Sequence, residues 1–484
     1  RIVFQNMLKQ SGLNRYLFEM ANIRDQCSWV HAREVEKATD KAFDLVKMAV
    51  AKAALLDPLQ EISVEVEPSC LVIGGGIAGM TCALNLAQQG YTVHLVEKTK
   101  TLGGNGARLY YGLKGEDALS LSRDLLKSVA SHPGITVHLG CTVESVEGYV
   151  GNFTTRLSSG AVIKHGAAVI ATGAKENKPA GFQYGKSRRV FTTLELEEKM
   201  AAGDPLIWKA GTIAFIQCAG TRNKEQPYCS RVCCGMTIRL ILQIKAQNPD
   251  GKILVFYRDM VTYGFLEQFY KEVRDMGVVF IRYPEEQEPV VEEISGPGGS
   301  SLLKVTVQDT SLGKELLFHP DVVALGSGIV PAADNKKLSH LFKVPLNEEG
   351  FFLEAHLKLR PVDSSSAGIF MCGLSHGPKN IEESIIQAKA AAARAGALLS
   401  KKSFTSEAAV AVVKTEKCQA CLTCVRLCPF GAPKMVKNRA RIEPVICRGC
   451  GVCAGECPNK AIYLLGYHDQ IADSMLESLL HDSE

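Results

Sequence analysis

The sequence predicts an α/β fold class, in which a helical segment precedes two parallel-sheet domains and a small cysteine-rich domain follows them. Three observations predict this arrangement. Between residues 66 and 402, short apolar runs typical of buried strands alternate with helical periodicity. A glycine turn with the spacing G-x-G-x-x-G follows the first of these strands. After residue 417, cysteines recur at fixed spacing in two copies.

Composition and charge limit the kinds of protein this chain can be. Its 484 residues are 46% hydrophobic and 22% charged, which are ordinary globular values. The 55 basic and 51 acidic residues leave a net charge of +4, which gives no electrostatic footprint for nucleic acid. We expect no membrane span and no secretory signal. The first residue is Arg1 rather than Met, so we expect an N-terminal part to be missing.

The 17 cysteines are grouped along the chain. Eight fall between Cys418 and Cys457, and four fall between Cys218 and Cys234. Spacings of two and three residues favour metal ligation over a disulfide framework in a chain of this length. We therefore expect a reducing, cytoplasmic setting.

The first 65 residues are expected to be helical. Apolar residues recur at helical spacing from Val35 to Leu56, and Asp57-Pro58 ends the pattern. Cys27 precedes this helix in ANIRDQCSWVH. A single cysteine beside a tryptophan is usually a buried thiol, and metal-binding partners for it would lie upstream of Arg1.

The glycine turn after the strand Leu71–Ile73 contains Gly74, Gly76 and Gly79. A pyrophosphate must lie against backbone N–H groups at the helix N-terminus, and a Cβ at Gly74 or Gly76 would hold it away. Gly79 allows the helix to pack closely on the strand. Glu97, 23 residues after Gly74, can accept hydrogen bonds from an adenosine ribose. The pattern predicts a dinucleotide site without separating FAD from NAD.

Two later segments favour a flavin. AAVIATGA and GIFMCG, the latter before an Ala-rich helix over 381–399, resemble elements of thioredoxin-reductase-like flavoproteins with two dinucleotide-binding domains. In those proteins the second segment closes the FAD site, often with Gly-Asp, whereas here Leu374 follows Gly373. The candidate cofactor contacts are Gly74, Gly76, Gly79, Glu97, Lys98, Gly103, Gly104, Ala171, Thr172, Gly173 and Gly373.

A second α/β unit, whose βαβαβ order predicts a parallel sheet, is inserted between these segments. After its first strand it has no glycine fingerprint, which argues against a nicotinamide site there. Instead CAGTRNKEQPYCSRVCC follows, with Cys218, Cys229, Cys233 and Cys234. Because thiolates are favoured at a helix N-terminus, this group can hold a cluster. A redox-active dithiol and merely buried thiols are the alternatives.

The C-terminal domain is an internal repeat of C-x2-C-x2-C-x3-C-P, typical of bacterial two-cluster ferredoxins over residues 414 to 465. Three thiolates of each loop bind one cluster, and the fourth binds the other. A zinc ribbon needs two CxxC pairs per metal and fits poorly. One [4Fe–4S] cluster is assigned to Cys418, Cys421, Cys424 and Cys457, and the other to Cys447, Cys450, Cys453 and Cys428.

The sequence therefore predicts a two-dinucleotide-binding-domain flavoprotein with a C-terminal two-cluster ferredoxin domain and a short helical N-terminal segment. The expected divisions are a helical remnant of a cluster domain at 1–65, the FAD-binding domain at 66–205 and 344–402, the inserted domain at 206–343, a linker at 403–417, the ferredoxin domain at 418–465 and a tail at 466–484.

At PYCSRVCC, with LVIGGGIAGM before it and the doubled cysteine motif after it, the chain resembles the A subunit of heterodisulfide reductase and its bacterial homologues. The resemblance extends from ANIRDQCSWVH through GPKNIEESIIQA to the ferredoxin repeat. It implies FAD, two clusters in the ferredoxin domain and one on the cysteines from 218 to 234. It also implies an N-terminal cluster domain, in which Cys27 would be a further ligand.

By the same resemblance, the function is electron transfer through FAD, in the family often electron bifurcation. The partners would be other heterodisulfide-reductase-like subunits and an electron-donating hydrogenase or dehydrogenase module, with ferredoxin as a further candidate. Flavins exchange one or two electrons and clusters one, so no acid, base or nucleophile is needed. Arg258 and His376 are polar candidates for tuning the flavin. The alternative is a self-contained NAD(P)H:acceptor flavin oxidoreductase.

Overall fold

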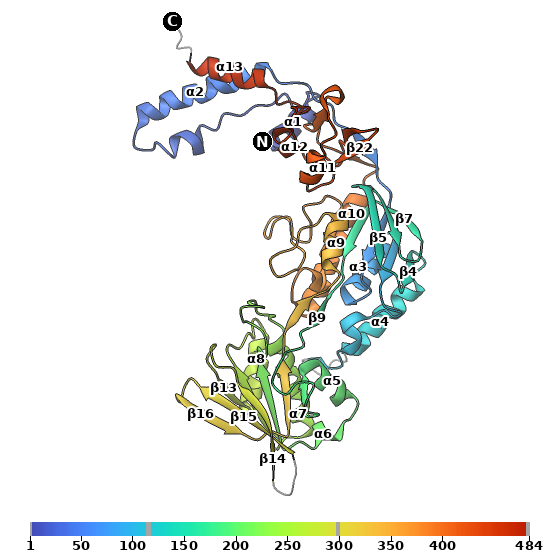
Figure 1. Ribbon diagram of the computed structural model, residues 1–484, viewed down its shortest axis with the longest axis vertical. Coiled ribbons are helices and arrows are strands. Elements are labelled where there is room, and N and C mark those ends of the chain that lie inside the picture. Colours follow the sequence, from blue (N-terminus) through green and yellow to red (C-terminus); the bar gives the residue numbers. More distant parts are fainter. Residues whose placement is uncertain (1, 113–117, 297–300, 481–484) are drawn as a thin grey trace. The chain divides into compact units, whose positions relative to one another are not determined.

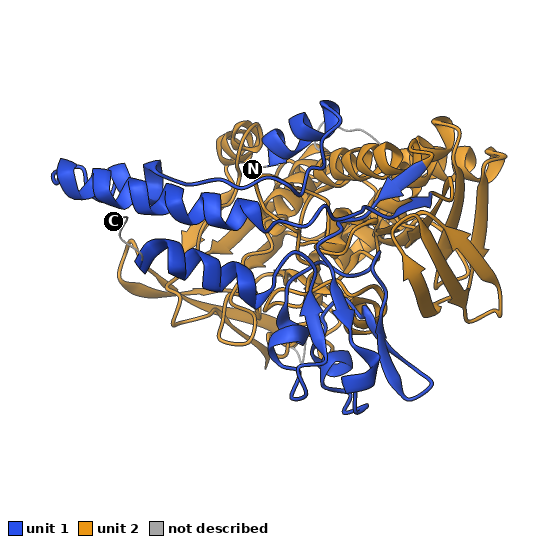
Figure 2. Ribbon diagram, turned by 90° about the horizontal axis from the view of Figure 1, so that it is seen from above, with its two compact units in different colours: residues 1–65, 403–484 blue, residues 66–402 orange. Residues whose placement is uncertain are grey.

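The computed structural model describes residues 2–112, 118–296 and 301–480, and the chain divides into two compact units (Figure 1). Unit 1 consists of both ends of the chain, residues 1–65 and 403–484, and unit 2 consists of residues 66–402 (Figure 2). No helix within the described ranges is both long and apolar enough to cross a membrane.

The first sheet of unit 2 is parallel, with the strand order β19-β8-β2-β3-β4. Strand β2 is buried along its whole length, which explains its unbroken apolar run. Helix α10 contacts α3, and its buried face consists largely of alanine, which allows close packing. The elements are β2 (Ser69–Ile73), α3 (Ile77–Gln88), β3 (Thr92–Glu97), α4 (Ala118–Ser131), β4 (Ile135–Leu139), β8 (Ala167–Ile170), β19 (Ile369–Met371) and α10 (Ile381–Leu399).

The second sheet is also parallel, as predicted, with the order β10-β17-β11-β12-β13. Helices α5, α7 and α8 contribute buried residues to the core of this domain. The elements are β10 (Val190–Thr192), α5 (Thr193–Ala201), α6 (Pro205–Trp208), β11 (Thr212–Gln217), α7 (Cys233–Gln247), β12 (Lys252–Tyr257), α8 (Leu266–Asp275), β13 (Val279–Arg282) and β17 (Val322–Gly326).

Three smaller groups of elements complete unit 2. One antiparallel sheet, β5-β6-β7, follows β4, and another, β14-β15-β16, precedes β17. Strands β9 and β18 pair antiparallel where the chain enters and leaves the second domain. The bounds are β5 (Val143–Tyr149), β6 (Asn152–Leu157), β7 (Val162–His165), β9 (Ala174–Glu176), β14 (Val290–Ser295), β15 (Ser301–Asp309), β16 (Lys314–Phe318), β18 (Ile329–Pro331) and α9 (Asn335–Phe342).

The structure differs from the sequence-based expectation at two elements of the second domain. Strand β10 joins the second sheet by pairing with β17, although it precedes residue 206. Helix α7 begins at Cys233, four residues before the expected start at Thr237, because its apolar periodicity becomes visible only after the first turn. Both thiols of the Cys233-Cys234 pair therefore lie at a helix N-terminus.

Unit 1 joins the N-terminal helices to the cysteine-rich domain. Helices α2 and α13 contact each other (Figure 1). Strand β1 pairs antiparallel with β20. Two further antiparallel pairs, β21 with β24 and β22 with β23, belong to the cysteine-rich domain. The bounds are α1 (Ile2–Gln10), η1 (Arg24–Ser28), α2 (Val35–Ala54), β1 (Ser63–Glu65), β20 (Ser403–Thr405), β21 (Ala411–Val413), α11 (Thr423–Leu427), β22 (Pro433–Val436), β23 (Arg439–Ile442), α12 (Val452–Gly455), β24 (Ile462–Leu464) and α13 (Asp469–Leu480).

Candidate flavin and iron–sulfur sites

The glycine turn between β2 and α3 is shaped by two close backbone contacts. Gly74 has φ +111°, and a Cβ there would lie 2.2 Å from the carbonyl oxygen of Ala171. A Cβ at Gly79 would lie 1.8 Å from the carbonyl oxygen of Gly74. Only glycine fits at both positions, so the end of β8 and the first turn of α3 approach the turn as closely as a dinucleotide fold requires.

Gly76 has a different environment from its neighbours. It is the N-cap of α3, its side-chain position has no atom within 4 Å, and it bridges to Gly103. The N-terminus of α3 therefore has no capping side chain and borders open space at Gly76. Gly104 lies against the Cα of Gly76, where its own Cβ would come within 3.1 Å. This cradle fits a pyrophosphate, because a Cβ at Gly76 would fill it.

Glu97 lies at the end of β3, and its buried carboxylate is held by three hydrogen bonds. Oε2 accepts from the Gly75 N–H at 2.6 Å, and Oε1 accepts from the Thr99 N–H at 2.8 Å and the Thr99 hydroxyl at 2.7 Å. A carboxylate has about four acceptor sites, so one remains for a ribose hydroxyl. The ammonium of Lys98 instead forms an ion pair with Asp334 at 3.1 Å.

The second and third flavin segments lie against the same turn. Thr172 donates its hydroxyl hydrogen to Asn335 Oδ1 at 3.2 Å, and Gly173 has φ +69°. Gly373 also has φ +69°, and a Cβ there would lie 2.7 Å from the Cβ of Ala78 on α3. The end of β19 therefore packs on the first turn of α3.

A set of polar side chains surrounds Gly373 that the sequence interpretation did not assign. Lys379 Nζ donates to the carbonyl oxygens of Gly373 and Gly377, each at 2.8 Å. Burial lowers the pKa of Lys379 to about 8, and the carboxylate of Glu383 opposes this shift. Gln387 accepts from the Gly373 N–H at 2.9 Å. These residues lie in the segment GPKNIEESIIQA that carries part of the family resemblance.

His376, a predicted tuning residue, belongs to this set. Its Nε2 lies 3.2 Å from Glu354 Oε2, and Gln387 Nε2 lies 3.4 Å from its Nδ1. Burial, followed by the charge of Lys379, lowers the pKa of His376. Arg258 lies elsewhere, at the cysteine loop, where it donates to the carbonyl oxygen of Arg222 at 2.8 Å. Arg258 therefore lies beside the thiol of Cys218 rather than beside Gly373.

The four cysteines of the second domain line one cavity of about 320 Å³, part of which is open solvent. Cys218 follows β11 with φ +58°, and Arg222 and Arg231 in the same loop have φ +56° and +60°. Several non-glycine residues in this conformation indicate a loop held by its surroundings, which is common at functional sites. The cysteines are Cys218, Cys229, Cys233 and Cys234.

Electrostatics distinguish between the interpretations of these thiols. Burial raises the pKa of Cys218 despite the guanidinium of Arg222, and burial raises the pKa of Cys234 to about 12. A reactive thiol requires a lowered pKa, and burial shifts the pKa of Cys218 and of Cys234 in the opposite direction. Metal ligation deprotonates a thiol outright, which makes a cavity lined by four thiols suitable for a cluster.

An ion pair joins the cysteine loop to the flavin domain. Arg231 Nη2 donates to Glu383 Oε1 at 2.7 Å and to the Tyr263 hydroxyl at 3.0 Å. Glu383 belongs to the capping box of α10, where Asn380 is the N-cap. The loop that carries Cys229 is thus joined to the helix N-terminus nearest Lys379.

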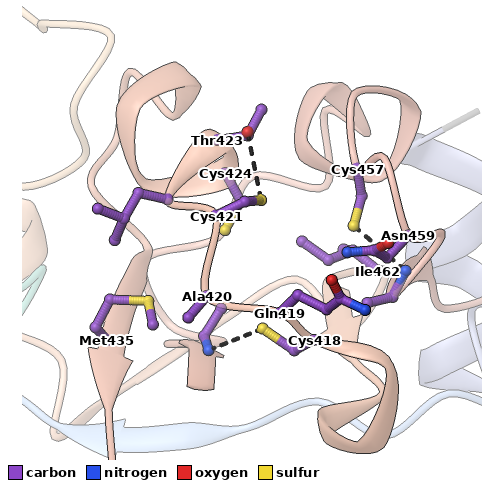
Figure 3. Close-up of a pocket in the computed structure, with 13 residues that line it drawn as sticks. Cys418, Gln419, Ala420, Cys421, Thr423, Cys424, Met435, Cys457, Asn459 and Ile462 are labelled. Atoms are coloured by element: carbon purple, nitrogen blue, oxygen red, sulfur yellow. Dashed lines mark hydrogen bonds between the residues drawn. The ribbon is translucent and has the colours of Figure 1, made fainter. Parts of the chain in front are cut away.

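In the C-terminal domain, a cavity of about 370 Å³, including open solvent, is lined by Cys418, Cys421, Cys424 and Cys457 (Figure 3). These are the four thiols that the repeat assigned to one cluster, and Cys457 comes from the other copy. The Ala440 N–H donates to Cys418 Sγ at 3.4 Å, and the Ala461 N–H to Cys457 Sγ at 3.3 Å. Such bonds stabilise thiolates and tune cluster potentials.

The second set is also gathered in one place. Burial raises the pKa of Cys453 to about 11, and the nearby thiols of Cys447, Cys428 and Cys450 add to the shift. The Ala411 N–H donates to Cys447 Sγ at 3.4 Å. Within the described residues, no three His, Cys, Asp or Glu side chains are arranged around a single ion. A cubane bonds each thiolate to a different iron, so its ligands need not converge on one point.

Cys27 lies alone in η1. Its side chain is 2% exposed, and its Sγ donates to the Ala38 carbonyl oxygen of α2 at 2.6 Å. In unit 1 it is therefore a buried thiol bonded to a helix backbone, and its role as a cluster ligand stays a prediction.

Comparison with known proteins identifies the two cofactor-binding regions. Residues 68–205 match the family "Pyridine nucleotide-disulphide oxidoreductase", and residues 411–434 match the "4Fe-4S binding domain". These matches imply FAD and [4Fe–4S] clusters. Thioredoxin reductase from T. acidophilum is similar to 68% of this chain over 99% of its own, at 17% identity and a TM-score of 0.48.

Relatives extend over most of the chain. The A subunit of the H(2):CoB-CoM heterodisulfide,ferredoxin reductase of Methanothermobacter thermautotrophicus is 32% identical over 91% of this chain and 80% of the relative. An iron-sulfur A subunit of the CoB--CoM heterodisulfide reductase of Methanopyrus kandleri is 33% identical over 91% and 81%. With residues 68–205 matching the pyridine nucleotide-disulphide oxidoreductases and residues 411–434 matching a [4Fe–4S] binding domain, this chain belongs to the oxidoreductase family formed by the A subunits of heterodisulfide reductases.

Proposed function

We propose that this chain is the flavin and iron–sulfur subunit of a cytoplasmic heterodisulfide-reductase-like complex, with FAD on the Gly74–Gly79 turn and three [4Fe–4S] clusters. FAD would exchange electrons singly or in pairs, whereas each cluster would exchange single electrons. The clusters would be held by the three four-cysteine sets at 218–234 and in the C-terminal repeat.

The observation that carries this proposal is the cavity lined by Cys218, Cys229, Cys233 and Cys234. It lies between β11 and α7, where a nicotinamide-binding domain would have its glycine cradle. The Arg231–Glu383 contact joins this loop to the N-terminus of α10. The second domain is thereby equipped for one-electron transfer beside the flavin domain.

The chain's own residues have defined tasks in this proposal. Gly76 and the first turn of α3 bind the pyrophosphate, and Glu97 binds the ribose. Lys379 holds a proton on Nζ beside Gly373, and its pKa of about 8 lets it release that proton close to neutral pH. Arg222 and Arg231 place positive charge at the thiol cavity, which favours bound negative charge.

The names of relatives indicate the partners of this proposal. The Methanothermobacter thermautotrophicus relative is named for H(2), the CoB-CoM heterodisulfide and ferredoxin, and a Methanosarcina acetivorans relative for ferredoxin or F(420)H(2). We therefore propose that this chain receives electrons from a hydrogenase or dehydrogenase module and works with further heterodisulfide-reductase-like subunits. Electron bifurcation would appear as ferredoxin reduction that depends on a simultaneous high-potential acceptor.

Cofactor analysis after anaerobic reconstitution tests the proposal. We expect one FAD and about twelve irons per chain, four for each of three clusters. Fewer than about eight irons per flavin would contradict it. The alternative, a self-contained NAD(P)H oxidoreductase, predicts rapid bleaching of the flavin by NADH or NADPH without any partner, whereas our proposal predicts slow or no bleaching.

A further inference from the structure

Arg258 and Cys218 follow neighbouring strands at the same edge of the second sheet. Strands β11 and β12 run parallel and are paired in register as far as Ile216 and Phe256. Cys218 and Arg258 each come two residues after this last pair. Parallel strands have their carboxyl ends at one edge of the sheet, and neighbouring strands lie about 4.8 Å apart. The register therefore brings a guanidinium close to the first of the four cysteines of the second domain.

The side chain of Arg258 is bonded to the loop that follows this cysteine. Its Nη1 donates to the carbonyl oxygen of Arg222 at 2.8 Å, and its Nη2 donates to Glu288 Oε1 at 3.0 Å. Its Cζ lies 5.6 Å from the centre of the Tyr283 ring, and the Tyr283 hydroxyl donates to the carbonyl oxygen of Gln217 at 2.5 Å. Arg258 and the ring beneath it thus hold the chain on both sides of the first cysteine.

The backbone next to Arg258 reaches a second thiol of the same site. Cys234 Sγ, in the first turn of α7, lies 3.7 Å from the carbonyl oxygen of Asp259. Burial raises the pKa of the Cys218 thiol, and the guanidinium charges of Arg222 and Arg258 oppose this shift. Arg258 is therefore close enough to the thiols for its charge to act on them.

Arg258 is the most deeply buried of three guanidinium groups at this site. Its side chain is 5% exposed, against 23% for Arg222 and 48% for Arg231. Buried charges are screened by water and salt much less than exposed ones. The carboxylate of Glu288, which pairs with Arg258, is 36% exposed and is therefore the more strongly screened member of the pair. The pair leaves an excess of positive charge on the buried side, where the thiols lie.

One donor of Arg258 has no hydrogen-bond partner among the residues that the structure describes. This donor is the buried Nε–H group. Buried donors are nearly always hydrogen-bonded, and an exception in a native protein calls for an explanation such as a redox role or a bound group. A cluster held by four thiolates is an anion, and its reduction potential depends on nearby charge and hydrogen bonds. A buried cation with an unused donor suits such an occupant.

We propose that Arg258 sets the reduction potential of the second-domain cluster, with Glu288 as its counter-charge. Reduction adds one electron to the site, with no bond made and no proton moved, so the site becomes one unit more negative. The buried guanidinium stabilises this reduced state and makes the cluster a better acceptor of electrons from the flavin. The inference rests on the proposed function, because it concerns the potential of a cluster assigned there.

The test measures the midpoint potential of this cluster in fully reconstituted protein, by redox titration with electron paramagnetic resonance. Arg258→Gln removes the charge, Arg258→Lys keeps it, and Glu288→Gln removes the counter-charge. The matched control is Lys252→Gln, because the exposed Lys252 begins β12, about 20 Å along the strand from Arg258. The signal of this cluster is identified as the one that is missing from Cys229→Ser.

The expected shifts have opposite signs. Removing a unit charge at about 10 Å, with an effective dielectric constant of about 20, changes an equilibrium roughly tenfold. We therefore expect Arg258→Gln to lower the midpoint potential by about 60 mV, which is tenfold for one electron. Glu288→Gln should raise the potential by a smaller amount, because its carboxylate is more exposed. Arg258→Lys and Lys252→Gln should stay within about twofold of the wild-type equilibrium.

Equal potentials in fully loaded wild type and Arg258→Gln would overturn the inference. Shifts of the same sign in Arg258→Gln and Glu288→Gln would also overturn it, since a merely structural pair disturbs the loop in both variants. If Arg258→Gln loses iron, Glu288→Gln decides alone, because it keeps the bond to Arg222: a raised potential supports the inference, and an unchanged or lowered one contradicts it. Iron analysis of the wild type tests the proposed function separately, and about eight irons instead of about twelve would overturn both.

Discussion

Arg231 and Glu383 form an ion pair at 2.7 Å that joins the cysteine loop of the second domain to the N-terminus of α10 in the flavin domain. Glu383 also accepts the Tyr263 hydroxyl hydrogen at 2.8 Å and closes the capping box on Asn380. One carboxylate thus stabilises a helix terminus and fixes the loop that carries Cys229. Its two roles can be separated by substitution.

Arg231→Gln removes the interdomain pair but leaves the capping box intact. Because both side chains are partly exposed, we expect less than about 1 kcal/mol loss in unfolding free energy. Electron transfer from photoreduced flavin to the cluster should slow several-fold, because the loop loses its anchor. Transient absorbance measures the rate of this electron transfer. The control is Lys304→Gln, which breaks a surface ion pair with Glu292. An unchanged rate would remove the positioning role of this pair.

Cys229→Ser should lower the iron content from about twelve to about eight per chain and leave FAD bound, because one of four thiol ligands is lost. Cys141→Ser changes a buried thiol outside the three sets and should keep the full iron content. Iron analysis and electron paramagnetic resonance of the reduced proteins are applied to both variants and measure how many clusters each one holds. If Cys229→Ser retains all of about twelve irons, the Cys229 thiol is not a required cluster ligand.

Gly79→Ala should lose its fold, whereas Gly76→Ala should lose affinity for FAD. A methyl group at Gly79 meets the Gly74 carbonyl oxygen, so Gly79→Ala should misfold or unfold readily. A methyl group at Gly76 meets no protein atom and has an ordinary φ of −77°. Gly76→Ala should therefore keep its melting behaviour without flavin but bind FAD at least about tenfold more weakly. A Gly76→Ala protein with a full flavin content would contradict the pyrophosphate assignment.

The buried ammonium of Lys379 makes the free energy of unfolding depend on pH. Its folded pKa of about 8 lies below the unfolded value, so the unfolded chain binds more protons between these values and stability rises with pH there. Relative to Lys379→Met, the wild type should gain on the order of 3 kcal/mol between about pH 8 and 10.5. Denaturant titrations at several pH values measure this difference in unfolding free energy between the wild type and Lys379→Met. A pH-independent difference would mean that the ammonium is not buried.

The sequence by itself determined the elements whose signals are local. Spacing rules located the Gly74–Gly79 turn, the three cysteine sets and helix α10, whose predicted bounds of 381–399 match the structure. The reason is physical: a glycine turn, a metal-binding loop and an amphipathic helix each impose their constraint over a few neighbouring residues. The crossed assignment of Cys457 to the set of Cys418 rests on the same repeat, and the structure brings these thiols to one cavity.

Only the tertiary structure decided which distant residues meet. Lys379 and Gln387 bond to Gly373, and Glu354 lies against His376. Arg231 reaches Glu383 across 152 positions, because hydrogen bonds and burial link segments without any periodic signal. Strand β10 likewise joined the second sheet by pairing with β17, an alignment set by packing rather than by its own three residues. Local sequence patterns identified the functional groups of the chain, and the tertiary structure identified which of these groups contact one another.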